Sequence, residues 1–191
     1  MTPFVTVVSG APRSGTSLMM QMLGAGGMEL LTDGARRADR DNPRGYFELE
    51  AVRRLPDDAR WLEGAVGRAV KVVHVLVPRL PEEHRYRILL MHREWREVLA
   101  SQRAMLLRGG GVPGGPPDER LAEIFDAQLA EVERWADSRP GAELLRVDYN
   151  ALVARPLPAA REVAAFLEGS VDADDMAAAV LPSLYRQRSF R

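Results

Sequence analysis

The sequence predicts a three-layer α/β fold in which helices flank a central, mostly parallel β-sheet. Short apolar runs rich in Val, Ile and Leu alternate along the chain with longer amphipathic runs. The apolar runs do not alternate with polar residues, which is typical of parallel strands that are covered on both faces. Strands that alternate with helices form such sheets through strand–helix–strand crossovers. Because the chain has 191 residues, 46% of them apolar, we expect one domain over residues 1–191.

The individual elements follow from these runs. Apolar runs bounded by turn residues predict strands at residues 4–8, 69–77, 86–91 and 144–147. Amphipathic patterns predict helices at residues 17–23, 94–107, 118–135 and 157–167. Two segments, 32–45 and 108–117, are rich in Gly, Pro and polar residues, so we expect loops there, at the rim of a site or as connectors.

The segment between the first strand and the first helix, residues 10–17 (GAPRSGTS), has the glycine spacing of a phosphate-binding P-loop. The usual loop has a lysine before its final hydroxyl residue, whereas this chain has Thr16 there and carries its cation inside the loop, at Arg13. That lysine reaches the β- and γ-phosphates of a nucleoside triphosphate, so its absence argues against ordinary ATP or GTP hydrolysis. The loop still predicts an anion site, formed by Arg13 and by the backbone amides of Ser14, Gly15, Thr16 and Ser17 at a helix N-terminus.

The string PRSGTS, residues 12–17, between a hydrophobic strand and a hydrophobic helix, resembles the 5′-phosphosulfate loop of sulfotransferases that use 3′-phosphoadenosine 5′-phosphosulfate (PAPS). The chain looks like a short, bacterial-type member of that family. The resemblance implies a P-loop NTPase-like fold and transfer of a sulfuryl group from PAPS to a hydroxyl or amine. It also implies that adenosine 3′,5′-bisphosphate is the product and that no metal is required.

A second anion site is predicted where the third strand meets the next helix. Arg93 lies at the carboxyl end of this strand, and Ser101 lies about two turns into the helix. Sulfotransferases carry an Arg and a Ser eight residues apart at this place, and both bind the 3′-phosphate of the cofactor. The resemblance therefore assigns this role to Arg93 and Ser101. One departure lies further along, because the family's usual Tyr-Glu-Asp-Leu string is here Tyr149, Asn150, Ala151 and Leu152, without either acid.

The residues that would carry out chemistry are less sharply defined. Lys71 is the only lysine in the chain, which suggests a requirement for an ammonium group. The family often has a lysine followed closely by a histidine on the corresponding strand, and here the histidine is His74. It comes one residue later than in the animal enzymes, a shift that turns a side chain to the other face of a strand. His74 is therefore a candidate base or an ordinary core residue, while Arg13 and Lys71 are the candidate cations for catalysis.

Glu48 is the preferred candidate for the catalytic base. Many bacterial and Golgi-type relatives use a carboxylate after the first helix, and residues 42–48 (NPRGYFE) look like a string in uncharacterised bacterial members. Arg44 and Tyr46 could then contact the acceptor or the cofactor. A glutamate near a helix start also interacts favourably with the helix dipole, so a purely structural role for Glu48 stays open.

Composition limits the partners. A formal net charge of -1 gives no global attraction to nucleic acid or to an anionic membrane, and without cysteine there are no disulfides or thiolate sites. No apolar run approaches the length of a membrane span and no N-terminal targeting signal is visible, so we expect a cytoplasmic protein. Oligomeric state is left open.

The acceptor is not identified by the sequence. Because a short chain has little material for a closed pocket, we expect an open site for a large or carrier-linked acceptor. Two alternatives remain at this point: a P-loop small-molecule kinase, disfavoured by the missing lysine and by the lack of a clear magnesium-holding acid, and a nucleotide-binding module that has lost catalysis.

Overall fold

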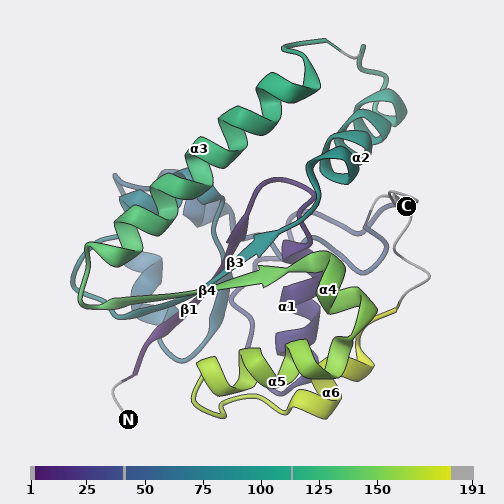
Figure 1. Cartoon of the computed structure of the whole chain (residues 1–191). Helices are drawn as coiled ribbons and strands as arrows, with labels where there is room; N and C mark the ends of the chain where they lie inside the picture. Colours follow the sequence, from purple (N-terminus) through teal and green to yellow (C-terminus); the bar gives the residue numbers. More distant parts are fainter. Residues whose placement is uncertain (1–2, 41, 113, 182–191) are drawn as a thin grey trace.

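A computed structural model of the chain, which describes residues 3–40, 42–112 and 114–181, has the predicted three-layer α/β architecture. Its sheet contains the parallel strands β1 (Val5–Gly10), β2 (Ala69–Lys71), β3 (Tyr86–His92) and β4 (Ala142–Asp148). The strand order is β2-β1-β3-β4, so the P-loop strand β1 lies inside the sheet (Figure 1). Parallel register from Val5↔Tyr86 to Gly10↔Met91 brings the carboxyl ends of β1 and β3 to the same edge.

Helices cover both faces of this sheet. On one face lie α1 (Thr16–Ala25), α4 (Tyr149–Ala154), α5 (Pro156–Phe166) and α6 (Ala173–Ala178). On the other lie α3 (Asp118–Asp137) and the 3-10 helices η1 (Glu50–Arg54), η2 (Arg60–Ala65) and η3 (His74–Arg79). None of the helices in the described part of the chain is both long enough and apolar enough to cross a membrane.

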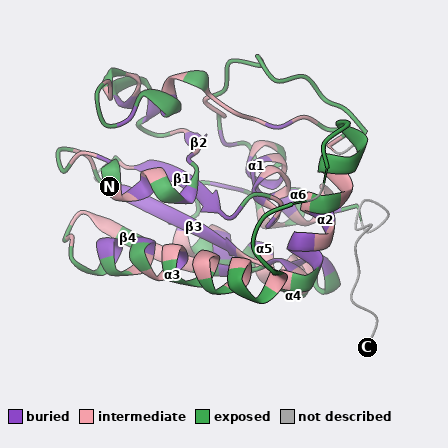
Figure 2. Ribbon diagram, turned by 90° about the horizontal axis from the view of Figure 1, so that it is seen from above, coloured by how far each residue is buried: buried purple, intermediate pink, exposed green. Residues whose placement is uncertain are grey.

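The strands divide their side chains between two cores. On β3, Leu89 and Met91 pack with α1, α4, α5 and α6, whereas Ile88 and Leu90 pack with α3 and the 3-10 helices. Both sets are fully buried, because successive side chains of a strand point to opposite faces. Figure 2 shows β1 and β3 as the buried centre of the molecule, whereas β4 at the edge of the sheet is partly exposed. This double burial explains why β1 and β3 read as continuous apolar runs in the sequence.

The helix α2 (Trp95–Arg108) begins at the carboxyl end of β3 and pairs with α3 in a helical hairpin that projects beyond the strands (Figure 1). Its first half is buried at Glu97, Val98, Leu99 and Ser101, whereas Leu106 and Leu107 near its end are exposed. The hairpin therefore stands over the same edge of the sheet as the P-loop.

The strand predicted at residues 69–77 is wrong beyond Lys71. After β2 ends, the backbone N–H of Val72 still donates to the carbonyl of Val8, but His74 already begins η3. Pro78 lies inside η3 and cannot donate to a sheet, while Val77 packs in the α3-side core. The 3-10 helix thus buries His74 and Val77 but leaves Val73 and Val75 exposed, where a strand covered on both faces would have buried all four.

The segment between α1 and η1 passes along the outer edge of β2 and then returns to the P-loop. Leu31 donates its backbone N–H to the carbonyl of Ala69, which covers that edge. Residues 32–49, which we call the strap, form no helix or strand among those described. Thr32 Oγ1 donates to the carbonyl of Glu48 at 2.9 Å, which joins the two ends of the strap.

Candidate functional site

The loop between β1 and α1 makes a tight turn that depends on residues with positive φ. Gly10 and Gly15 have φ values of +147° and +106°, and Arg13 is held in the left-handed region at φ +78°. A Cβ on Gly10 would lie 2.5 Å from Ser14 Oγ and 2.7 Å from the carbonyl oxygen of Met91, so only glycine fits there. Ser14 is buried, and its hydroxyl oxygen has no hydrogen-bond partner among the described residues. The loop has the close-packed geometry of an anion cradle.

The structure brings the two predicted anion sites into direct contact. Arg13 Nε donates to Ser101 Oγ at 2.9 Å, so the loop arginine reaches the helix α2. Arg93 Nη1 donates to the carbonyl oxygen of Arg13 at 3.2 Å. Residues that are 80 and 88 positions apart in the chain therefore form one cationic cluster at the carboxyl edge of β1 and β3.

Arg93 is held from several sides by residues that the sequence did not single out. Its Nε donates to Oε2 of Glu97 at 2.9 Å, and Glu97 is only 3% exposed. Asn150 Nδ2 donates to the same carboxylate oxygen at 3.2 Å, and the ring of Tyr149 lies under the guanidinium carbon at 4.4 Å. A buried carboxylate needs such partners, because an uncompensated charge in the interior is strongly unfavourable. The amide at Asn150 meets this need where a carboxylate would repel Glu97.

Lys71 joins the strap to the P-loop. Its Nζ donates to Ser17 Oγ at 3.2 Å and to the carbonyl oxygen of Tyr46 at 3.0 Å. It also lies 3.8 Å from Oε1 of Glu48, which pairs with Arg36 Nη1 at 3.0 Å. Burial lowers the pKa of Lys71 to about 8; Glu48 opposes this shift, and the positive charges of Arg36 and Arg13 add to it. The site thus contains an ammonium group that titrates in the mildly alkaline range beside a carboxylate.

His74 occupies a different place from the other candidates. It is 3% exposed, with Nδ1 3.2 Å from the carbonyl oxygen of Gly10 and Nε2 2.8 Å from Oε1 of Gln128. Its ring meets Phe125 of α3 edge-on, at 6.2 Å between centroids. The structure therefore places His74 in the core behind the loop, where its ring nitrogens face protein atoms.

A cavity of about 350 Å³ opens beside the loop at the carboxyl edge of the sheet. Of the residues predicted for the site, it is lined by Arg13, Gly15, Thr16, Ser17, Glu48, Lys71, Arg93 and Ser101. Ser14 and His74 do not line it. The strap contributes Arg36, Asn42, Pro43 and Tyr46 to its wall, and α2 contributes Met105 and Arg108. Within the described ranges, no cluster of three or more His, Asp or Glu side chains could hold a metal ion.

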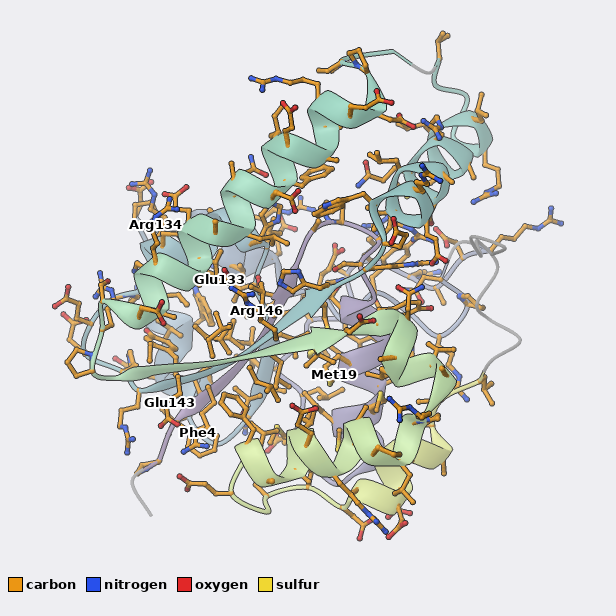
Figure 3. All side chains as sticks on the ribbon, in the orientation of Figure 1. Phe4, Met19, Glu133, Arg134, Glu143 and Arg146 are labelled. Atoms are coloured by element: carbon orange, nitrogen blue, oxygen red, sulfur yellow. The ribbon has the colours of Figure 1, made fainter. Side chains whose placement is uncertain are left out.

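A larger hollow of about 740 Å³ lies elsewhere, between the end of α3 and β4. Its lining includes Glu133, Glu143 and Arg146, which Figure 3 places along β4 and α3. None of the predicted site residues lines this hollow. We therefore assign the candidate site to the smaller cavity, where the cationic cluster, the glycine loop and the Lys71–Glu48 pair meet.

Two strap residues were expected to contact ligands. Arg44 instead donates to the carbonyl oxygen of Ala179 at 2.8 Å, which fastens the strap to the end of α6. Tyr46 donates its hydroxyl to Asp39 at 2.8 Å and lies under the Arg36 guanidinium at 3.4 Å. Burial raises the pKa of Tyr46. Tyr46 thus braces Arg36, a cation that the sequence did not single out.

Replacing Gly15 by alanine is expected to destabilise the protein more than replacing Gly27 by alanine. Both glycines have positive φ, +106° and +93°, so both substitutions carry a similar backbone cost. A Cβ at Gly15 would also lie 2.3 Å from Tyr149 Cδ2, whereas nothing lies within 4 Å of one at Gly27. We expect Gly15→Ala to lower the free energy of unfolding by about 1–3 kcal/mol more than Gly27→Ala in urea denaturation. Equal effects would show that Tyr149 does not pack tightly on the loop.

The fold is shared with two solved structures at low sequence identity. No protein-family model and no curated protein matches the chain. Among solved structures, a sulfotransferase domain from the curacin biosynthetic pathway aligns over 92% of this chain and 77% of its own, with TM-score 0.53 and 15% identity. Retinol dehydratase, solved with androsterone and the inactive cofactor PAP, aligns over 95% of this chain with TM-score 0.51 and 16% identity. The chain spans 64% of that enzyme's length.

A sugar kinase from a Janibacter species is less similar, with TM-score 0.45 and 11% identity, and we conclude nothing from this match. This chain shares the P-loop-like α/β fold of the curacin-pathway sulfotransferase domain and of retinol dehydratase. At 15% and 16% identity they establish the fold alone.

Proposed function

We propose that this protein is a sulfotransferase that moves a sulfuryl group from PAPS to a hydroxyl or amine of an acceptor and leaves adenosine 3′,5′-bisphosphate. The observation that carries the proposal is the meeting of two cationic sites in one cavity, Arg13 on the loop and Arg93 with Ser101 beside it. A nucleotide with phosphates on both the 3′ and 5′ oxygens needs two such sites. A nucleotide with a single phosphate chain needs only the loop.

The residues present fit this nucleotide. The backbone amides of the loop, at the N-terminus of α1, offer hydrogen bonds to a 5′-phosphate. Leu18, Tyr149 and Val153 add apolar surface to the same cavity, as a nucleoside would require. When bound, PAPS would supply an activated sulfuryl group on its 5′-phosphate. Arg93 and Ser101 would hold the 3′-phosphate, a role supported by their contacts with Arg13.

In the proposed reaction, the acceptor oxygen or nitrogen forms a bond to sulfur as the bond from sulfur to the 5′-phosphate oxygen breaks. The electron pair of the broken bond leaves with the phosphate, and the acceptor loses one proton. We assign that proton to Glu48, because its carboxylate lines the cavity 3.8 Å from Lys71. Lys71 and Arg13 would stabilise the charge on the leaving oxygen, since positioning and electrostatics dominate such transfers.

The acceptor is proposed to be large or carrier-linked. The cavity is bordered by the strap on one side and by the helical hairpin on the other, and Arg36, Pro43 and Arg108 on this rim are exposed. The site therefore opens to solvent between two projecting segments. A reactive group on a long arm could enter there while the body of the acceptor stays outside.

Isothermal titration calorimetry tests the proposal on the intact protein. Adenosine 3′,5′-bisphosphate is expected to bind at least about 30-fold more tightly than AMP, because it adds charge-assisted hydrogen bonds at Arg93 and Ser101. ADP and ATP are titrated with and without magnesium. Tighter, magnesium-dependent binding of ATP would instead support the kinase alternative. Bisphosphate binding without turnover on any acceptor would support the inactive module.

A further inference from the structure

Just before the P-loop, the contacts between β1 and the chain that follows β2 change from backbone hydrogen bonds to side-chain contacts. The ladder ends at the pair Val8↔Lys71, and two side chains then continue it. Ser9 Oγ donates to the carbonyl oxygen of Val72 at 2.8 Å. The ring of His74 approaches the carbonyl oxygen of Gly10 at 3.2 Å through Nδ1. The last residue of β1 is thus fixed by a histidine side chain.

A small displacement of the Gly10 backbone would change the position of the whole loop. It is buried, and even a Cβ at this position would collide with the Ser14 hydroxyl and the Met91 carbonyl. Its carbonyl group belongs to the peptide unit that leads into Ala11, whose own carbonyl accepts from the Ser14 amide at 3.1 Å. The orientation of the Gly10 peptide therefore sets the start of the turn that aims the loop amides.

His74 is itself rigidly held. It is 3% exposed, its Nε2 lies 2.8 Å from the amide group of Gln128 and its ring packs edge-on against Phe125. Gln128 and Phe125 both belong to α3, the helix that forms the projecting hairpin with α2. The imidazole therefore bridges α3 and the first glycine of the loop, and it does not line the cavity.

We infer that His74 is a positioning residue of the phosphate cradle: it anchors the Gly10 carbonyl to α3, and it is not the base of the reaction. The Gly10 carbonyl oxygen can only accept, so Nδ1 carries the proton and donates it there. Nε2 is then an acceptor, and it is satisfied when the Gln128 amide is turned so that its NH2 group, instead of Oε1, faces the ring. Because the cradle is the 5′-phosphate site of the proposed function, the inference rests on that function. It predicts that His74 contributes to anion binding without exchanging a proton with the acceptor.

Two substitutions of His74 distinguish the contribution of Nδ1 from that of Nε2. An asparagine amide can place a donor near the position of Nδ1, whereas a glutamine amide places it near the position of Nε2. His74→Asn is expected to bind adenosine 3′,5′-bisphosphate within about threefold of wild type, because the bond to Gly10 is kept. His74→Gln is expected to bind about tenfold more weakly, because that bond is lost. Pyrophosphate, which needs only the loop, should show the same ratio in calorimetry.

Thermal unfolding of both variants corrects each titration for the folded fraction. Equal affinities for His74→Asn and His74→Gln would overturn the inference, since a residue that only fills the core would not distinguish the nitrogens. With an active acceptor, the pH dependence of kcat/KM for His74→Asn should keep the shape of wild type. Loss of its acidic limb would assign the base to His74 and overturn the inference.

Binding by the wild-type protein shows whether the proposed function has failed, independently of the two His74 variants. If wild type shows no preference for the bisphosphate but binds pyrophosphate, the sulfotransferase proposal fails, and the two variants still test His74 against pyrophosphate. If wild type binds neither probe, the loop is not an anion cradle and both proposals are wrong.

Discussion

Arg93→Ala is expected to remove the preference for adenosine 3′,5′-bisphosphate over AMP. The guanidinium is held at the carboxyl end of β3 by Glu97 and by the ring of Tyr149, in contact with the Arg13 backbone. Loss of its charge-assisted hydrogen bonds to a 3′-phosphate should weaken bisphosphate binding about 100-fold. AMP should change by less than about threefold, because the loop and the Arg13 side chain remain. Calorimetry at one fixed salt concentration measures both.

The substitution has a side effect that requires its own control. Arg93→Ala would take away the guanidinium that lies 2.9 Å from the buried Glu97 carboxylate, and breaking a buried ion pair in this way costs about 3–5 kcal/mol of stability. The double variant Arg93→Ala/Glu97→Gln removes this negative charge and should recover stability, but it should not recover the bisphosphate preference. Arg96→Ala, an exposed arginine on the first turn of α2, controls for net charge. A bisphosphate preference that survives in the double variant would show that the 3′-phosphate binds elsewhere.

The alkaline limb of the pH profile is expected to report Lys71. Its pKa of about 8 means that the ammonium cation is present below pH 8 and is lost as the pH rises through that value. If this cation stabilises the leaving phosphate, kcat/KM, which reports the free enzyme, should fall about tenfold per pH unit above 8. Lys71→Arg keeps a cation at every accessible pH, so its slower reaction should show no such limb.

Glu48→Gln supplies the matched comparison. Loss of a general base should lower kcat by about 10²–10⁴-fold. The negative charge of Glu48 also raises the pKa of Lys71, so its removal should move the alkaline limb to lower pH. An alkaline limb that stays unchanged in both Lys71→Arg and Glu48→Gln would mean that another group controls it.

The parts of the fold that sequence could predict are those with local causes. The loop is recognisable because its glycines satisfy a backbone requirement within eight residues, and β1 and β3 are recognisable because both of their faces are buried. The predicted helix at residues 118–135 corresponds to α3 because its apolar stripe follows the helical period over many turns. Arg93 and Ser101 meet the loop because β1 and β3 are adjacent, which parallel topology favours.

The elements that were missed are short or ambiguous. The helices α4 and α6 have six residues each, too few for a periodic signal. The run after Lys71 is apolar in any conformation, so its change to a 3-10 helix depended on the core beneath α3. His74 could not be placed for the same reason, because its position depends on where β2 ends.

Within the site, sequence reasoning identified the cations but not what holds them. The pair of Arg93 and Glu97 has the four-residue spacing of a helical ion pair, a signal that was available. The pairing of Arg36 with Glu48 had no such signal, because the strap has no regular period and folds according to what it touches. Asn150 looked like a loss of acidity, but in the structure its amide donates to Glu97 and accepts from the backbone N–H of Glu94.

The single lysine of this chain has a practical consequence for chemical labelling. The chain has no other side-chain amine, because its other 25 Lys or Arg positions are all arginine, which does not react with acylating reagents as an amine does. The Lys71 side chain is 15% exposed and loses its proton near pH 8, so a substantial fraction is nucleophilic under mild conditions. Apart from the α-amino group, an acylating reagent would therefore mark one place, inside the cavity. A compound that binds in the cavity should slow the acylation of Lys71. An acceptor could therefore be detected in a mixture of compounds before its identity is known.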